Sequence, residues 1–144
     1  MLKKDYTVHI DAIKVLLNNE YKDLWGIECK DYNEERLSKL EKLKKELEDS
    51  YKKFNNNKRI TDTLSSKILL GTLGCVPAYD RYFKIGCKKQ KITQKFCKKS
   101  IIEICGFYKQ YKNEIEKKRN KLTIYRKVKY PQMKLIDMGF WNGR

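Results

Sequence analysis

The 144-residue chain lacks several features that define common classes of protein. It has no apolar run near the roughly 18–20 residues that a membrane helix requires, so we expect neither a transmembrane segment nor a membrane partner. Its first stretch, "MLKKDYTVHIDAIKVLLNNEY", mixes acids and amides with apolar residues, and we therefore expect no signal peptide. P-loop, H-E-x-x-H and G-x-S-x-G motifs are absent from the sequence.

Metal and disulfide patterns are also missing. His9 is the only histidine, and no two cysteines have C-x-x-C spacing, so the sequence predicts no metal site and no cofactor. The odd number of cysteines favours reduced, mostly buried thiols in a cytoplasmic protein. These five residues are Cys29, Cys75, Cys87, Cys97 and Cys105.

Acidic residues are scarce in one segment only. Residues 84–134 contain 17 Lys and Arg but 3 Asp and Glu, whereas residues 1–60 contain 14 and 12. Most of the net charge of +16 therefore lies in about a third of the chain. A lysine-rich coding bias would add lysines but would not remove acids from one segment. This asymmetry is typical of proteins that bind nucleic acid or another acidic partner.

The predicted function is nucleic-acid binding without sequence specificity, with DNA or RNA, duplex or single strand, left open. Small basic proteins of this kind are frequent in mobile-element and defence systems, the setting that we expect. Tyr108, Tyr111 or Tyr125 would stack on bases if the target were single-stranded, although Tyr108 also suits the core. An alternative is an inhibitor or interaction module that binds an acidic or nucleic-acid-binding protein. The candidate phosphate contacts are Lys88, Lys89, Lys91, Lys98, Lys99, Lys117, Lys118, Arg119, Arg126, Lys127 and Lys129.

Apolar residues repeat at helical spacing and no strand pattern stands out, so we expect one all-α domain, a compact bundle of about five or six helices. Expected helices run from about 7 to 24, from a cap at Asp31 to Phe54, from Thr61 or Asp62 to Gly71, from Pro77 to Gly86, from a cap at Thr93 to Ile115, and from Pro131 onward. The stretch "NNNK" at 55–58 indicates a flexible linker, and residues 116–130 fit either a helix or an extended segment.

The stretch "SKILLGTLGCVPAYDRYF" breaks the helical pattern with a glycine turn between the third and fourth helices. Together with the ending "YPQMKLIDMGFW", it resembles the helix–hairpin–helix DNA glycosylase superfamily and its uncharacterised bacterial relatives. The matching positions are Lys67, Gly71, Gly74, Pro77 and Asp80. The resemblance implies a base-processing hydrolase or lyase in which Asp80 is the catalytic acid.

A structural interpretation of the same residues is open. Asp80 would cap the fourth helix, and Asp137 would take Arg81 or a tyrosine hydroxyl as its partner, because an isolated buried carboxylate is costly. Gly71, Gly74, Pro77, Arg81 and Asp137 would then join the middle of the chain to its last helix. We favour this interpretation and a non-enzymatic protein.

Overall fold

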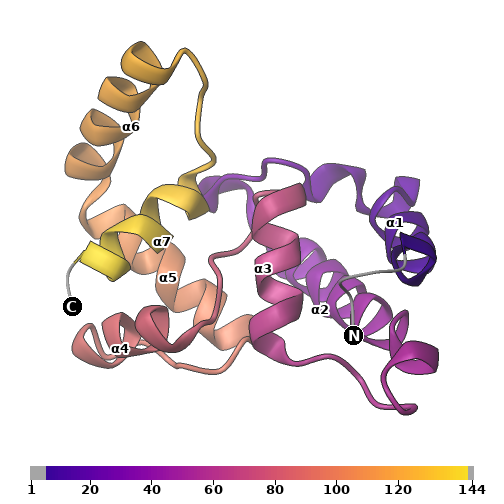
Figure 1. Ribbon diagram of the computed structural model, residues 1–144. Helices are drawn as coiled ribbons and strands as arrows, with labels where there is room; N and C mark the ends of the chain where they lie inside the picture. The colour runs from indigo at the N-terminus through magenta and orange to yellow at the C-terminus, as the bar shows by residue number, and fades with distance from the viewer. Residues whose placement is uncertain (1–5, 143–144) are drawn as a thin grey trace.

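The computed structural model describes residues 6–142, and within that range the chain forms helices and connecting segments without a strand, which confirms the all-α prediction (Figure 1). One hydrophobic cluster runs through the molecule, from Ala12 near the start to Phe140 near the end. The helices of the described range outnumber the expected five or six because the first, second and fifth predicted helices are divided and a short helix at Cys29–Asp31 is added.

The first predicted helix is divided into η1 (Tyr6–His9), α1 (Ile10–Leu16) and η2 (Asn19–Leu24). Asn18 causes the break, since its side chain accepts a hydrogen bond from the Glu20 N–H and caps η2. Ala12 and Leu16 are buried, while Ile10 and Ile13 on the other face of α1 are exposed.

Helix α2 (Glu34–Asp49) follows η3 (Cys29–Asp31) and buries the predicted leucine stripe. Its cap is Asn33 instead of Asp31, because the Asn33 side chain accepts the Arg36 N–H at 2.9 Å. After η4 (Lys52–Phe54), residues 55–58 form a turn with positive φ angles at Asn56 and Asn57 and internal hydrogen bonds.

Helix α3 (Asp62–Thr72) starts after Thr61, whose hydroxyl accepts the Leu64 N–H as predicted. The helix passes through Gly71 and ends at Thr72. Gly74, just beyond the C-cap Leu73, has a φ of +64° and donates its N–H to the Leu69 carbonyl. A Cβ at Gly74 would lie 2.6 Å from Pro131 Cγ, so glycine also permits the C-terminal segment to approach.

Helix α4 (Arg81–Lys89) starts four residues later than predicted. The backbone of Tyr79 is held by α3, since its N–H donates to Ser66 Oγ and its carbonyl accepts from Thr63 Oγ1. These bonds keep Pro77 outside the helix, and Asp80 becomes the N-cap. The helix also continues through Gly86, where we expected it to stop.

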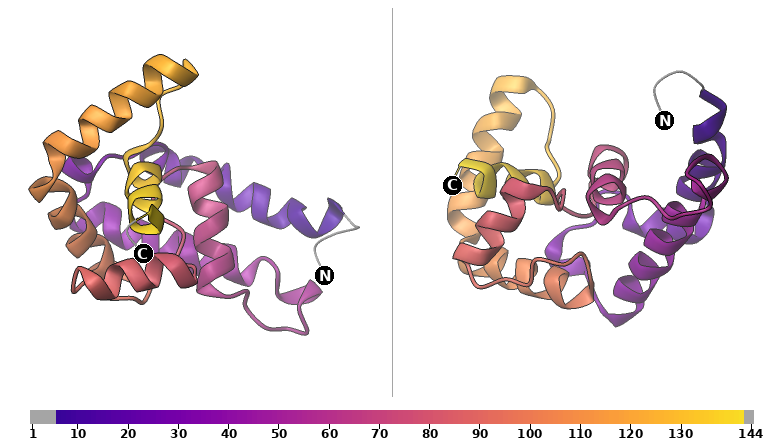
Figure 2. Two further views of the ribbon diagram at one scale, coloured as in Figure 1. Left: turned by 60° about the vertical axis from the view of Figure 1, so that its left-hand side comes forward. Right: turned by 60° about the horizontal axis from the view of Figure 1, so that its bottom comes forward.

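Helices α5 (Lys98–Gln110) and α6 (Lys112–Arg126) replace the single fifth helix, with the division at Tyr111. Thr93 does not cap α5, because its N–H and hydroxyl both donate to Glu103 on that helix. The ambiguous stretch after residue 115 is helical as far as Arg126, and Lys127 ends it in the left-handed conformation. Helix α6 stands away from the body (Figures 1 and 2).

Helix α7 (Gln132–Asn142) follows Pro131 as predicted and packs on α4. Gly86 permits this contact, because a Cβ there would lie 2.8 Å from Phe140 Cβ. Phe83 stacks on Phe140 with ring centroids 4.9 Å apart, and Tyr79 contacts Phe83 edge-on. This aromatic cluster fixes α7 beside the segment that connects α3 with α4.

Candidate functional site

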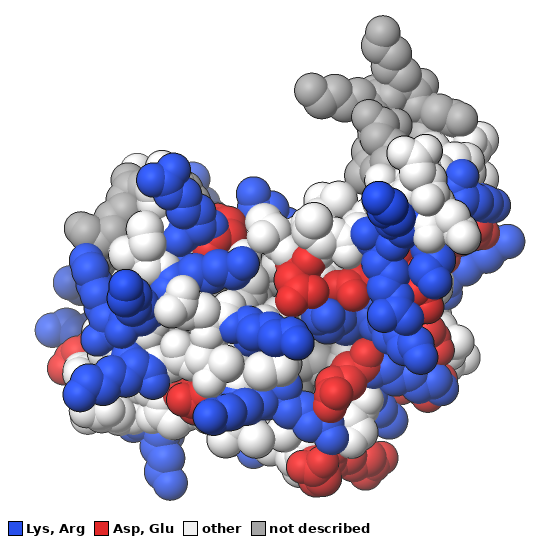
Figure 3. Space-filling model, turned by 90° about the horizontal axis from the view of Figure 1, so that it is seen from below, with Lys and Arg blue, Asp and Glu red and all other residues white. Residues whose placement is uncertain are grey.

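The most prominent surface feature is a group of exposed cations on the half of the molecule formed by α4, α5 and α6. Figure 3 shows this half densely covered by Lys and Arg over α4, whereas acids and bases are mixed over α2. We define the basic surface as the exposed cations of residues 84–134, other than Lys89, that make no ion pair with a described residue. They are Lys88, Lys91, Lys95, Lys99, Lys109, Lys112, Lys117, Lys118, Lys121, Arg126, Lys127 and Lys129.

In the N-terminal half, many cations form ion pairs with nearby acids. Lys39 and Arg36 both contact Asp23, and Lys42 lies 2.6 Å from Glu20. Ion pairs also join Lys53 to Asp11, Lys52 and Arg59 to Asp49, and Lys44 to Glu48 and Asp62. Residues 1–60 hold 14 bases and 12 acids, whereas residues 84–134, which carry the basic surface, hold 17 and 3. The positive charge of the basic surface is therefore largely uncompensated and attracts polyanions.

Two predicted phosphate contacts do not belong to this surface. Lys98 is half-buried and its ammonium lies 2.8 Å from Glu34 and 3.3 Å from Glu41 on α2. Arg119 is 6% exposed and forms ion pairs with Glu28 and Glu116. Both cations form ion pairs that hold parts of the fold together. Lys89 is exposed at the end of α4.

Arg119 anchors the protruding helix α6 at its base. Its guanidinium donates to Glu28 at 2.7 Å and to the Tyr130 carbonyl at 2.7 Å, which ties α6 to the chain before η3 and to the segment entering α7. Burial acts to raise the pKa of the Glu116 carboxyl, but the Tyr108 hydroxyl and Arg119 outweigh it and lower that pKa. Tyr108 is therefore a buried structural residue, since its hydroxyl donates to Glu116 at 2.6 Å.

The outer end of α6 combines cations with exposed apolar side chains. Ile124 and Tyr125 are each 80% exposed, and the guanidinium of Arg126 lies over the Tyr125 ring. Tyr111, by contrast, is half-buried against Phe107. Of the three tyrosines predicted to stack on bases, Tyr125 is the one whose ring is presented on the surface.

The charge of Lys99 lies at a position where it does not stabilise its own helix. It is exposed in the first turn of α5, where the positive end of the helix dipole disfavours a cation, and the N-cap residue Cys97 makes no side-chain cap. Free helix N–H groups beside a lysine favour an anion. Lys88, at the C-terminal end of α4, is instead favourable for its helix.

The turn segment, residues 71–80, borders a pocket of about 780 Å³ between α3 and α7. Asp80 lines this pocket and caps α4 by accepting the Phe83 N–H at 2.9 Å, as the structural interpretation predicts. The complete lining comprises Lys67, Leu70, Gly71, Thr72, Gly74, Ala78, Asp80, Tyr130, Pro131, Lys134, Asp137 and Met138.

Asp137 on α7 is 6% exposed and lines the same pocket. Neither exposed Arg81 nor Tyr79 is its described partner, and the Tyr79 hydroxyl bonds to Ser100. The carboxylate instead accepts the Ala78 N–H at 3.1 Å, which joins the turn segment to the last helix. Burial raises the pKa of Asp137, against the lowering effects of the Ala78 N–H and of Lys134.

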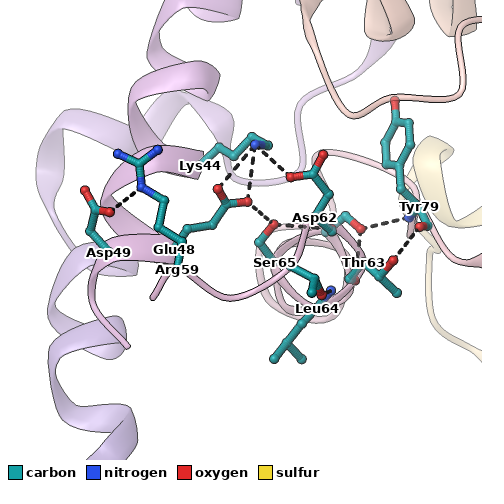
Figure 4. Close-up of polar contacts among 11 residues, drawn as sticks. Lys44, Glu48, Asp49, Arg59, Asp62, Thr63, Leu64, Ser65 and Tyr79 are labelled. Carbon is teal, nitrogen blue, oxygen red and sulfur yellow. Dashed lines mark hydrogen bonds and ion pairs between the residues drawn. The ribbon is translucent and has the colours of Figure 1, made fainter. Parts of the chain in front are cut away.

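A second polar network lies between α2 and α3 (Figure 4). Buried Glu48 accepts the Ser65 hydroxyl at 2.7 Å, and Lys44 bridges Glu48 and Asp62 at 3.3 and 3.0 Å. Burial acts to lower the pKa of Lys44, but the two carboxylates outweigh it and raise that pKa. Because Ser65 is fully buried and its hydroxyl bonded, this network holds helices together and does not form a reactive site.

The described residues provide no evidence for a metal site or for a reactive cysteine. Residues 6–142 hold no group of three or more His, Cys, Asp or Glu side chains placed for a metal ion. Burial raises the pKa of the Cys75 thiol to about 12, opposite to the shift that activates a nucleophilic cysteine. None of the helices in this range has the length and hydropathy needed to cross a bilayer.

Comparison with known protein families, curated proteins and solved structures finds no match to this chain. The function must therefore be inferred from the residues and geometry of the chain itself.

Sequence reasoning missed part of the pocket. Lys134 and Tyr130 line it but were absent from the predicted sites. The spacing offered a clue for Lys134, because it precedes Asp137 by three residues and so shares its face of a helix. Nothing local indicates that Tyr130 would line the same pocket as Gly74, since its position depends on how α6 returns to α7.

Proposed function

We propose that the protein binds nucleic acid without sequence specificity through the basic surface. The observation that carries the proposal is the charge imbalance of this half, since residues 84–134 hold 17 bases and 3 acids, whereas residues 1–60 hold 14 and 12. Binding to phosphates would release counterions and relieve the repulsion among the lysines.

Helix α6 provides the principal contact in this proposal. It stands away from the body, so its outward side can approach a nucleic-acid backbone (Figure 2). Lys117, Lys118 and Lys121 would contact successive phosphates, while exposed Tyr125 would stack on an unpaired base near the helix end. Buried Arg119 would act indirectly by keeping α6 in position.

Two charge-reversal variants, one on the basic surface and one control, test the proposal. One variant changes Lys117, Lys118, Lys121 and Lys127 to Glu. The matched control changes Lys14, Lys22, Lys45 and Lys58 to Glu, four exposed lysines outside the basic surface that make no ion pair with a described residue. Both variants lose the same net charge, and Glu and Lys have similar helix propensities.

Fluorescence anisotropy with random-sequence duplexes and single strands measures the result. We expect the α6 variant to lose at least about tenfold in affinity for one of these at about 50 mM salt, and the control to change much less because distant charges are screened. Equal losses in the two variants would contradict a localised surface. An absence of binding by the unaltered protein would refute the proposal and favour an acidic protein partner.

A further inference from the structure

The pocket between α3 and α7 is distinct from the basic surface and is not explained by it. Its volume of about 780 Å³ falls within the range of about 300–1,000 Å³ found for pockets that hold small organic ligands. Its charged lining is balanced, with two cations, Lys67 and Lys134, and two acids, Asp80 and Asp137. A ligand that contacts the two cations and Asp137 needs an anionic group and a hydrogen-bond donor edge.

Asp137 supplies unused acceptor capacity. An ionised carboxylate has about four lone-pair sites, and within the described residues Asp137 accepts one hydrogen bond, from Ala78. A carboxylate that is 94% removed from solvent pays a desolvation cost that one backbone N–H compensates only in part. Donor groups of a ligand in the pocket would complete its hydrogen bonding.

The remaining walls suit a flat ring and a phosphate. Leu70, Pro131 and Met138 provide apolar surface, and Tyr130 lies beside them. The cations come from two helices, Lys67 from α3 and Lys134 from α7. A phosphate between them would neutralise both.

Gly71 keeps one wall of the pocket open. It lies inside α3 without a positive φ, and a Cβ placed there would meet no atom within 4 Å. Glycine costs about 1 kcal/mol relative to alanine inside a helix. Neither backbone conformation nor packing requires this glycine, whereas any longer side chain at residue 71 would narrow the pocket.

We propose that this pocket binds a nucleoside monophosphate, with the phosphate between Lys67 and Lys134 and the base edge on Asp137. Guanine fits best, because its adjacent ring N–H and amino donors match the two oxygens of a carboxylate. The nucleotide would be free in solution or the 5′-phosphorylated end of a strand. The site functions whether or not the basic surface binds nucleic acid.

Isothermal titration of the purified full chain with GMP, UMP and inorganic phosphate tests the proposal. We expect GMP to bind more tightly than UMP, and phosphate to bind most weakly. Gly71→Phe should lose at least about tenfold in GMP affinity while unfolding at the same or a higher temperature. Gly106→Phe is the matched control, since Gly106 also lies in a helix with no atom within 4 Å of its Cβ and does not line the pocket.

Further variants separate the parts of the site. Asp137→Asn should reduce the preference for GMP over UMP, because the amide would present a donor to the base, and Lys134→Met should weaken both nucleotides equally. The α6 charge-reversal variant should keep its affinity for GMP. Gly71→Phe should keep its affinity for duplexes with blocked ends. Failure of one proposal can therefore be told apart from failure of the other.

Competition between GMP and a 5′-phosphoguanosine oligonucleotide identifies the source of the ligand. Competition assigns the site to a strand end, and GMP binding without competition assigns it to the free nucleotide. Absence of GMP binding by the unaltered protein, UMP binding as tight as GMP, or full affinity in Gly71→Phe would overturn the proposal.

Discussion

Two aspartates of the pocket show how burial and hydrogen bonding divide the roles of similar side chains. Asp80 is half-buried and uses one oxygen to cap α4, a role that a helix start next to a glycine turn already suggests. Asp137 is buried and bonds to Ala78, 59 residues earlier. The sequence predicted that Asp137 needs a partner but not which one, because Ala78 has no polar side chain and contributes its backbone.

The capping role of Asp80 makes a prediction that separates structure from catalysis. Asp80→Ala should lower the free energy of unfolding by about 1 kcal/mol, and Asp80→Asn should change it little, since Asn and Asp cap equally well. Urea denaturation measures both. The catalytic alternative is tested by incubating the protein with duplexes that carry damaged bases and scoring abasic sites. An excision activity that a stable Asp80→Asn variant has lost would contradict the structural role.

Asp137 should make stability depend on pH in the acid range. Its pKa in the folded protein is raised by burial and by Asp80, while Ala78, Lys134 and Lys67 act in the opposite direction. A raised pKa means that the folded state holds the proton more tightly than the unfolded state. Stability from this group is therefore complete below the unfolded pKa of 3.8 and is lost as pH rises through the folded pKa.

The variant Asp137→Asn keeps the acceptor for Ala78 and removes the charge. We expect it to match or exceed the unaltered protein in free energy of unfolding at pH 7, with the advantage disappearing as the pH approaches about 4. Urea denaturation of both proteins across this range provides the measurement. A variant much less stable at pH 7 would show that the charge itself stabilises the fold.

At the scale of elements, local signals located helices better than they located helix ends. The α2 stripe and the Thr61 cap follow from periodicity and capping chemistry, which are encoded within a few residues. The start of α4 depends instead on Ser66 and Thr63 holding Tyr79, and such tertiary bonds leave no local pattern.

The contact between α4 and α7 predicts how a methyl group added at Gly86 changes the stability of the protein. Gly86→Ala places a Cβ 2.8 Å from Phe140 Cβ and should lower the free energy of unfolding by about 1–3 kcal/mol, more than the gain in helix propensity. Gly106→Ala, with open space around its Cβ, should instead raise stability by about 0.5–1 kcal/mol. Thermal unfolding checks the pair. If the two variants changed stability in the same direction, α4 and α7 would not pack as described.

At the scale of the whole molecule, the charge distribution was readable from the sequence, whereas the use of each charge was not. A segment with 17 bases and 3 acids must expose most of its cations, because it offers few acids to pair with. Arg119 departs from this pattern through Glu28, which lies 91 residues earlier and reaches it only after folding. Lys98 is likewise taken up by acids of α2.

The central claim, that the uncompensated charge binds phosphates, is tested most directly by a salt titration of the unaltered protein. Affinity for a random-sequence duplex, measured by anisotropy between about 50 and 200 mM salt, should fall linearly on a log–log plot. If six phosphates are neutralised, the slope should be about −5, and it should become shallower by about 1 for each lysine of the basic surface that is removed. A slope near zero, or a slope that losing Lys117 or Lys121 leaves unchanged, would contradict the account.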